Sequence, residues 1–233
     1  MPASQVQADM PPAPDPNPAS AFAEAARYAL LRRLAPSMRH HLVVNLQPIG
    51  MIYEVMDRRL RAPTPDLAHV QDSAGKINGF ARAALQSCVD VVSWLAPDAA
   101  ATCTVRDAVR ESMGLLATSL SFRGYALRDE TAELPGLIHR AGIRNLLTAT
   151  LIHCTDQSPA PADLALGTTA EAGYAVVSVT VRPTQGAAGL QSEANYRKLT
   201  WADLQAMAEA DGTRVSREGD RVVLRFPWLA AAA

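Results

Sequence analysis

Apolar residues recur every three or four positions through the N-terminal third of the chain. This spacing places them on one side of a helix with 3.6 residues per turn. We predict a single helix of about 40 residues, from Ser20 to Leu60. Kinks are expected at Pro36 and Pro48, because a proline removes a backbone donor and crowds the carbonyl four residues earlier. The stripe contains, besides Asn45, the residues Leu31, Leu34, Met38, Leu42, Ile49, Ile52 and Met56.

A second helix follows a short break, the segment RAPTPD from Arg61 to Asp66. Two long helices joined by a short loop pack antiparallel. A hairpin cannot cover its stripes on all sides, so we expect a homodimer in which two hairpins form a four-helix bundle. Burial of the stripe against the rest of the same chain is the alternative. The predicted stripe of the second helix is Leu67, Val70, Ala74, Ile77, Ala81, Leu85, Cys88 and Val92.

After residue 97 the pattern changes to alternating helices and strands. The predicted fold class is α+β: a long antiparallel helical hairpin followed by an α/β sandwich with helices on one face of a mixed sheet. The domains are a disordered Pro/Ala-rich tail at 1–19, the hairpin at 20–97 and the sandwich at 98–233. The elements expected in the sandwich are a lead-in at Cys103–Val105, helices at Arg106–Ser121, Leu137–Cys154 and Thr200–Ala210, strands at Gly124–Leu127 and Gly173–Arg182, and a hairpin of Thr213–Ser216 with Arg221–Phe226.

Composition narrows the partners and the compartment. The 22 basic and 23 acidic residues nearly balance, which gives no reason to expect nucleic acid as a partner. Three cysteines without a CxxC spacing favour a reducing compartment over a disulfide framework. No apolar run approaches the roughly 18 residues of a membrane span, and no signal peptide is recognisable. We expect a cytoplasmic protein without a membrane partner.

Two adjacent histidines, His40 and His41, lie in the middle of the first predicted helix. Counting about 100° per residue from Met38, His41 falls at the edge of the apolar stripe and His40 lies nearly opposite to it. His40 is therefore expected to be exposed, either as a reactive group or as an ordinary surface histidine. Adjacent helical positions diverge, so neither this pair nor His153–Cys154 is predicted to hold a metal ion.

The order of these parts resembles the core of bacterial two-component histidine kinases. The resemblance covers about Ala21 to Pro227 and includes the segments TVRDAVRESMGLLATSLSFRGYALRDE and LIHRAGIRNLLTATLIHCTD. The segment HHLVVNLQ, from His40 to Gln47, is similar to the His-Arg-Val-Lys-Asn-Asn-Leu-Gln signature of one kinase subclass. The resemblance implies that the hairpin serves dimerisation and phosphotransfer, that the sandwich is an ATP-binding domain, and that His40 is the phospho-acceptor.

The chain departs from the kinase pattern at several positions. His41 replaces the acidic residue that usually follows the acceptor histidine, and is a possible assisting group. The family's Asn for Mg²⁺ and Lys for phosphate align with Ala149 and Ile152. The segment Val181–Gly189 lacks the expected Asp, and no second glycine-rich loop precedes Leu199. We therefore predict a degenerate ATP-binding domain that has lost ATP and Mg²⁺ binding, with no cofactor and no metal.

The resemblance extends to bacterial dimeric histidine phosphotransferases built as degenerate kinase cores. The predicted function is a phosphorelay step in which His40 passes a phosphoryl group between receiver-domain aspartates, with Mg²⁺ supplied by the partner receiver domain. Arg32–Arg33 are either solvated charges or steering groups for an acidic receiver. The alternatives are a non-catalytic dimeric module that binds or inhibits a kinase or response regulator, and an atypical active kinase. The predicted partner-binding residues are Val43, Val44, Gln47 and Met51.

Overall fold

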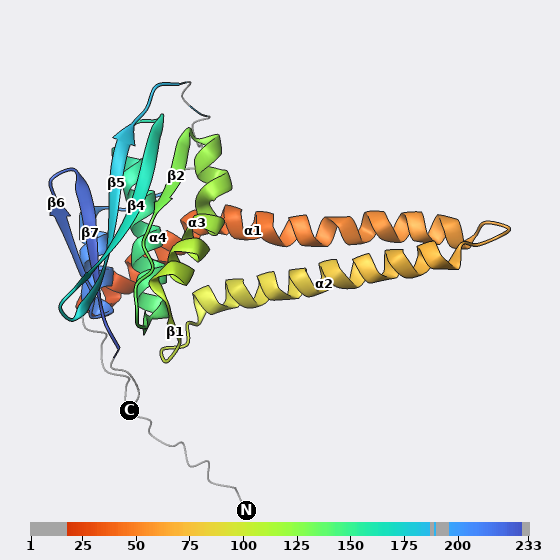
Figure 1. Cartoon of the computed structure of the whole chain (residues 1–233), viewed down its shortest axis with the longest axis horizontal. Helices are drawn as coiled ribbons and strands as arrows, with labels where there is room; N and C mark the ends of the chain where they lie inside the picture. The colour runs from red at the N-terminus through yellow and green to blue at the C-terminus, as the bar shows by residue number, and fades with distance from the viewer. Residues whose placement is uncertain (1–17, 187–188, 190–195, 230–233) are drawn as a thin grey trace, which may run out of the picture.

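A computed structural model describes residues 18–186, 189 and 196–229 of the protein. Two long helices project as a hairpin from an α/β sandwich, which gives the molecule an elongated shape (Figure 1). This arrangement confirms the predicted fold class. The predicted tail, apart from its last two residues, lies outside the described residues, as does part of the loop after Pro183.

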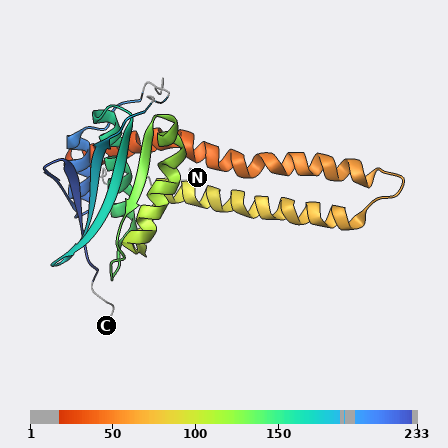
Figure 2. The ribbon, with the colours of Figure 1, turned by 45° about the horizontal axis from the view of Figure 1, so that its top comes forward.

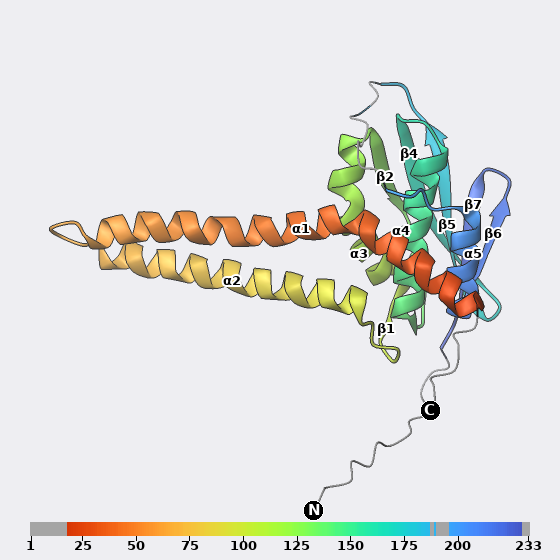
Figure 3. The same ribbon diagram turned by 180° about the vertical axis from the view of Figure 1, so that it is seen from behind.

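The hairpin consists of α1 (Pro18–Leu60) and α2 (Leu67–Leu95). α1 is a continuous helix through Pro36 and Pro48. It changes direction where it leaves the sandwich, and the remainder runs without a visible break to the loop (Figure 3). α2 begins at Leu67, directly after the predicted break, and Asp66 caps it: its carboxylate accepts hydrogen bonds from the backbone N–H groups of Ala68 and His69 at 3.1 and 3.2 Å.

The contact face of α1 was predicted correctly, whereas that of α2 was predicted only in part. Asn45 in the α1 stripe donates from Nδ2 to Oγ of Ser87 at 3.1 Å, so Ser87 marks the side of α2 that meets α1. Val70 and Ile77 of the predicted α2 stripe are half-buried, but its other members are exposed, with Leu67, Leu85 and Val92 at 71%, 66% and 58%. The side chains of α2 that are buried or half-buried are Val70, Ser73, Ile77, Phe80, Ala84, Ser87, Val91, Ser93 and Trp94.

The sandwich contains a five-stranded mixed sheet in the order β2-β4-β5-β7-β6. β2 and β4 are parallel, and the other neighbouring pairs are antiparallel. A separate antiparallel pair joins β1 (Thr102–Cys103) to β3 (Ile138–His139). The long strand β4 has no counterpart among the predicted elements. The sheet strands are β2 (Tyr125–Glu130), β4 (Ala162–Glu171), β5 (Tyr174–Pro183), β6 (Arg214–Glu218) and β7 (Arg221–Pro227).

Three helices cover one face of the sheet, as predicted (Figure 2). They are α3 (Val105–Phe122), α4 (Arg140–Gln157) and α5 (Trp201–Ala210). α4 begins and ends three residues later than expected. It lies in the middle of the sandwich and is buried along most of its 18 residues.

The first half of α1 forms an additional layer on the sandwich. It crosses α4 and α5 (Figure 3) and buries five apolar side chains in the common core. Two ion pairs hold it there, Arg27 with Asp211 and Arg33 with Asp156. The division of the chain into 20–97 and 98–233 stays a prediction, but α1 contributes to both parts. The five buried side chains are Ala26, Ala29, Leu30, Leu34 and Met38.

Candidate functional site

The two histidines lie on α1 beyond the part that crosses the sandwich. His40 is exposed and His41 is half-buried, as the helical periodicity predicts. Their ring centroids are 6.2 Å apart and the planes are tilted by 49°. Because adjacent positions point in different directions, the two imidazoles face different surroundings. The role of His40 as a phospho-acceptor stays a prediction.

The residues predicted to bind a partner share the outward side of α1 with His40. Val43, Val44 and Met51 are 47%, 50% and 63% exposed, and Gln47 is exposed as well. Among the residues that the structure describes, no other element buries them, so an approaching protein would meet an apolar surface around the imidazole. Their docking role stays a prediction.

The segment of α1 around this surface contains basic but no acidic side chains, and two of its arginines, Arg27 and Arg33, pair with carboxylates of the sandwich. Residues 25–53 contain four arginines and no aspartate or glutamate. The sequence left open whether Arg32 and Arg33 are solvated charges. Arg33 is not solvated. Its guanidinium donates two hydrogen bonds of 2.8 Å to the carboxylate of Asp156, and only 12% of its side chain is exposed. Arg32 lies over the ring of Tyr196, 5.8 Å from its centroid.

His41 lines a pocket of about 610 Å³ where the hairpin meets the sandwich. Cys103 is the nucleophile of highest intrinsic reactivity in this pocket, but burial raises its pKa to about 11, so the thiol stays protonated and unreactive near neutral pH. The pocket therefore surrounds His41 with side chains but contains no second group that is nucleophilic near neutral pH. Its lining is His41, Asp90, Trp94, Thr102, Cys103, Asp107, Arg110, Glu111, Gly114, Leu115 and Arg140.

One buried arginine, Arg144 of α4, links the sandwich to the base of the hairpin. Its guanidinium donates to Ser93 Oγ at 2.9 Å and to the carbonyl of Asp90 at 3.2 Å. The same group lies 4.0 Å from the centroid of the Trp94 ring and forms an ion pair with Glu111 at 3.0 Å. Burial lowers the pKa of Arg144 to about 10, so the group stays charged at neutral pH. This junction could not be predicted from the sequence, because its residues lie on three separate helices.

The positions that align with the kinase family's ATP-binding residues lie inside the core. Ala149 is 0% exposed and Ile152 is 3% exposed. One turn further along α4, Asp156 binds Arg33 of α1 and accepts a hydrogen bond from the backbone N–H of Leu199 at 3.2 Å. α1 and the segment before α5 thus occupy that side of α4. The loop predicted to lack the adenine-binding Asp lies partly outside the described residues, at 187–188.

His153 and Cys154 are residue types that bind metals, but the sequence did not predict a metal site at this pair. In the structure the His153 side chain joins α4 to neighbouring segments. Its Nδ1 lies 2.7 Å from the carbonyl oxygen of Leu199, and its Nε2 lies 3.4 Å from Nη2 of Arg217. A guanidinium can only donate, so Nε2 accepts and Nδ1–H donates. Burial raises the pKa of Cys154 to about 12. Among the described residues no group of three or more histidine, cysteine or acidic side chains is placed to hold a metal ion.

The fold is similar to the cores of histidine kinases, which combine a helical hairpin with an α/β sandwich. A histidine kinase from Burkholderia phymatum matches with 15% identity and a TM-score of 0.42, over 88% of this chain and 98% of that chain. A bacterial phosphotransferase matches with 16% identity and a TM-score of 0.39, over 84% and 95%. The histidine kinase ThkA, solved in complex with the response regulator protein TrrA, matches with 14% identity and a TM-score of 0.39, over 87% and 62%.

No model of a known protein family matches the chain, and no curated protein does so. At this level of identity the likeness describes the fold, and the chemistry follows from this chain's own residues. In the part of the chain that the structure describes, no helix has the length and apolar character needed to cross a membrane.

Proposed function

We propose that the protein is a histidine-containing phosphotransfer protein of a two-component phosphorelay, which passes a phosphoryl group between receiver-domain aspartates through His40 without hydrolysing ATP. The observation that carries this proposal is the environment of His40. The imidazole is exposed on the outward side of α1, beside the exposed apolar side chains of Val44 and Met51. The surrounding segment, residues 25–53, has no carboxylate that would repel an aspartyl phosphate.

The transfer step requires little from this chain besides a nucleophile. A neutral imidazole nitrogen of His40 attacks the phosphorus of an aspartyl phosphate, forming a P–N bond while the P–O bond to the aspartate breaks. The aspartate leaves as a carboxylate. The partner's own Mg²⁺ and cationic side chain neutralise the charge on the phosphoryl oxygens, so positioning in line is the main contribution of the histidine protein. His41 is the candidate for assisting proton transfer.

The burial of α4 supports transfer without ATP. Contacts to Mg²⁺ and to the phosphates need oxygen ligands and cationic groups at the surface of a pocket. The two aligned positions carry apolar side chains, Ala149 and Ile152, which are enclosed in the core. The Arg33–Asp156 ion pair further fixes α1 over the same helix. A nucleotide would have to displace these contacts to reach α4.

The proposed partners are the receiver domains of response regulators, the class of protein with which ThkA was solved. A receiver presents its aspartyl phosphate among further carboxylates that bind Mg²⁺. The exposed Arg39 beside His40, in a segment without acidic residues, is complementary to such an acidic rim.

A second copy of the chain is the proposed partner of the hairpin's apolar side. Leu85, Val89 and Val92 of α2 are each more than half exposed. They lie on another side of α2 than Asp90 and Trp94, which line the pocket beside α3, so the sandwich leaves the apolar side open. A four-helix bundle formed by two hairpins would bury this side and remove its apolar surface from water.

The test is the transfer of label from radiolabelled phospho-receiver domains to the purified protein and its variants. Wild type and His41→Ala are expected to acquire acid-labile label, His41→Ala more slowly, and His40→Ala is expected to acquire none. A tight complex without any label on the wild type would favour the non-catalytic binding module. Label acquired from ATP and Mg²⁺ alone would favour an atypical kinase, and either result would overturn the proposal.

A further inference from the structure

The C-terminal end of α3 carries an exposed aromatic side chain. Phe122 is the last residue of this helix and is 67% exposed. Its neighbours Leu116 and Leu120 are 2% and 1% exposed and point into the core. Counting about 100° per residue, Phe122 points away from Leu120 by about 200°, so it belongs to the outer side of α3. A phenylalanine in this position adds nothing to the core and leaves apolar surface in water.

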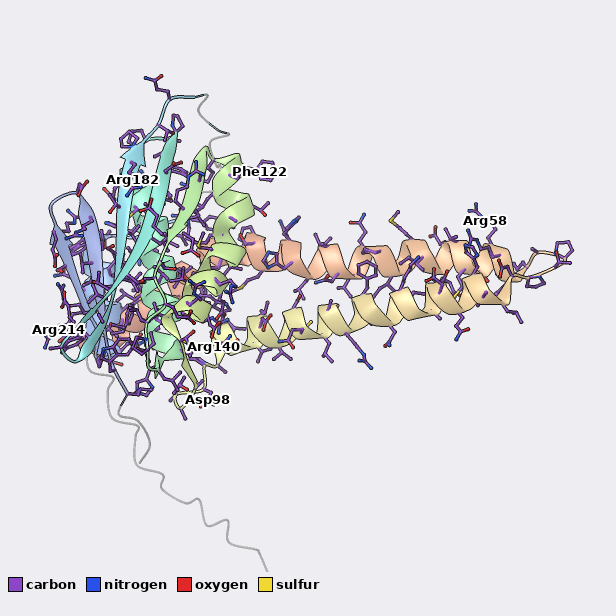
Figure 4. All side chains as sticks on the ribbon, in the orientation of Figure 1. Arg58, Asp98, Phe122, Arg140, Arg182 and Arg214 are labelled. Carbon is purple, nitrogen blue, oxygen red and sulfur yellow. The ribbon has the colours of Figure 1, made fainter. Side chains whose placement is uncertain are left out.

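The helical period of α1 directs His40 toward the side of the hairpin on which Phe122 lies (Figure 4), and we call the region between these two side chains the corner between α3 and α1. Figure 4 labels Arg58 on the side of α1 turned away from α2, and shows Phe122 projecting on that side of the hairpin from the end of α3. His40 and Arg58 are 18 residues apart, which corresponds to five turns of an α-helix, so they project in the same direction. His40 lies nearer the sandwich because the chain reaches it first after α1 leaves that domain.

The two chain segments at this corner contain arginines and no carboxylate of their own, and Asp156 of α4 pairs with Arg33 from one segment and Arg123 from the other. Residues 25–53 of α1 contain no acidic side chain, and neither do residues 112–128, which include the end of α3 and the start of β2. Arg39, immediately before His40, is exposed. Arg123 caps the end of α3 directly after Phe122. The corner therefore favours an acidic partner with an apolar contact at its edge.

We propose that the receiver domain docks in this corner, with the surface around His40 on one side and Phe122 as an apolar anchor on the other. This inference rests on the proposed function. A partner the size of a domain that brings an aspartyl phosphate to the imidazole of His40 must also meet the end of α3. Aromatic side chains are enriched in the buried part of protein interfaces, and such a side chain contributes strongly to binding when docking removes it from water.

The test separates docking from the chemistry of His40. Phosphoramidate, a small donor that needs no docking surface, is used to phosphorylate the full-length protein directly. Purified receiver domains phosphorylated with acetyl phosphate are then used as protein donors, at protein concentrations below saturation. In Phe122→Ala the rate with phosphoramidate is expected to equal that of the wild type, whereas kcat/KM with the receiver falls roughly tenfold.

Leu137→Ala is the matched control, because Leu137 is also a large apolar residue, 45% exposed, but lies just before β3. It is expected to transfer like the wild type with both donors. Equal kcat/KM for Phe122→Ala and wild type with the receiver would overturn the docking inference and leave the proposed function intact. Phosphoramidate labelling of His40 without label from any receiver would instead overturn the proposed function, and the docking inference with it.

Discussion

Arg144 is the side chain with the most contacts across the junction of sandwich and hairpin. It binds the last turn of α2 through Ser93 Oγ and the Asp90 carbonyl, stacks on Trp94 and pairs with Glu111. A cation at the C-terminal end of a helix also interacts favourably with the helix dipole. Because guanidinium is planar and offers several donors, a lysine cannot reproduce this set of contacts.

Arg144→Lys is expected to lower the free energy of unfolding by about 2–3 kcal/mol, since buried partners lose their hydrogen bonds. Chemical denaturation followed by circular dichroism measures the change. Arg140→Lys is the matched control: Arg140 pairs with the same Glu111 but is 40% exposed, so its replacement should cost less than about 1 kcal/mol. Equal unfolding curves for Arg144→Lys and the wild type would contradict the role of Arg144 as the junction.

Asp203 stabilises the start of α5 and gives stability a pH dependence. Burial alone would raise its pKa, but hydrogen bonds from Arg197 and from the backbone and hydroxyl of Thr200 outweigh burial and lower the pKa below 3.8. The carboxylate therefore stabilises the fold above about pH 4, and this contribution is lost as the pH falls through the folded-state pKa. Asp203→Asn should lower the free energy of unfolding at pH 7 by about 1–2 kcal/mol.

Thermal unfolding of wild type and Asp203→Asn at several pH values tests this. The difference in Tm is expected to be largest near neutral pH and to shrink as the pH falls through the lowered folded-state pKa of Asp203. A difference in Tm that stays constant down to acidic pH would show that the negative charge of Asp203 does not contribute to stability.

At the level of single elements, periodicity predicted α1 better than α2. Leu34 and Met38 are buried and His40 is exposed, as predicted. The apolar stripe of α1 packs on the sandwich before the bend and on α2 after it, so one stripe describes both contacts. α2 has two apolar sides, one of which packs on α1 while the other, containing Leu85 and Val92, is exposed in the monomer. A sequence pattern locates apolar sides but does not say which of two meets the neighbouring helix.

The strand β4 escaped prediction for a related reason. Its sequence ADLALGTTAE is rich in alanine and has only one β-branched pair, Thr168–Thr169, so its intrinsic strand preference is weak. Its place in the sheet is secured by pairing with β2 on one side and β5 on the other. Leu164 and Leu166 are 0% exposed in the core. Tertiary burial, which local sequence does not encode, stabilises this strand.

At the level of the whole molecule, only the part of the candidate site that lies on a single helix could be predicted from the sequence. His40 and its apolar neighbours were predictable because they lie on one helix with a known period. The pocket beside His41 and the corner that contains Phe122 require the position of α3 relative to α1, which depends on packing between distant segments. The positive charge of residues 25–53 was visible in the sequence, and the lack of acidic residues is the signal that could have marked this surface.

The whole molecule is expected to be a dimer of twice its 24.9 kDa mass. Leu85→Glu places a charge in the middle of the proposed seam and should produce monomers, measured by sedimentation or light scattering. Gln86→Glu is the control, because it adds the same charge at the next position, on another side of α2. A monomeric wild type, or a dimeric Leu85→Glu, would contradict the proposed four-helix bundle.

The shared helix α1 has a consequence for how the protein can be divided. Leu30 and Leu34 are almost fully buried on the sandwich, yet the same helix continues to the surface that carries His40. Residues 98–233 alone would expose the apolar surface on which the first half of α1 packs. A hairpin that began after this segment would lose its packing contacts with the sandwich. The two parts of the molecule therefore share one core, and residues 98–233 expressed without α1 are expected to be less stable and less soluble than the full-length protein.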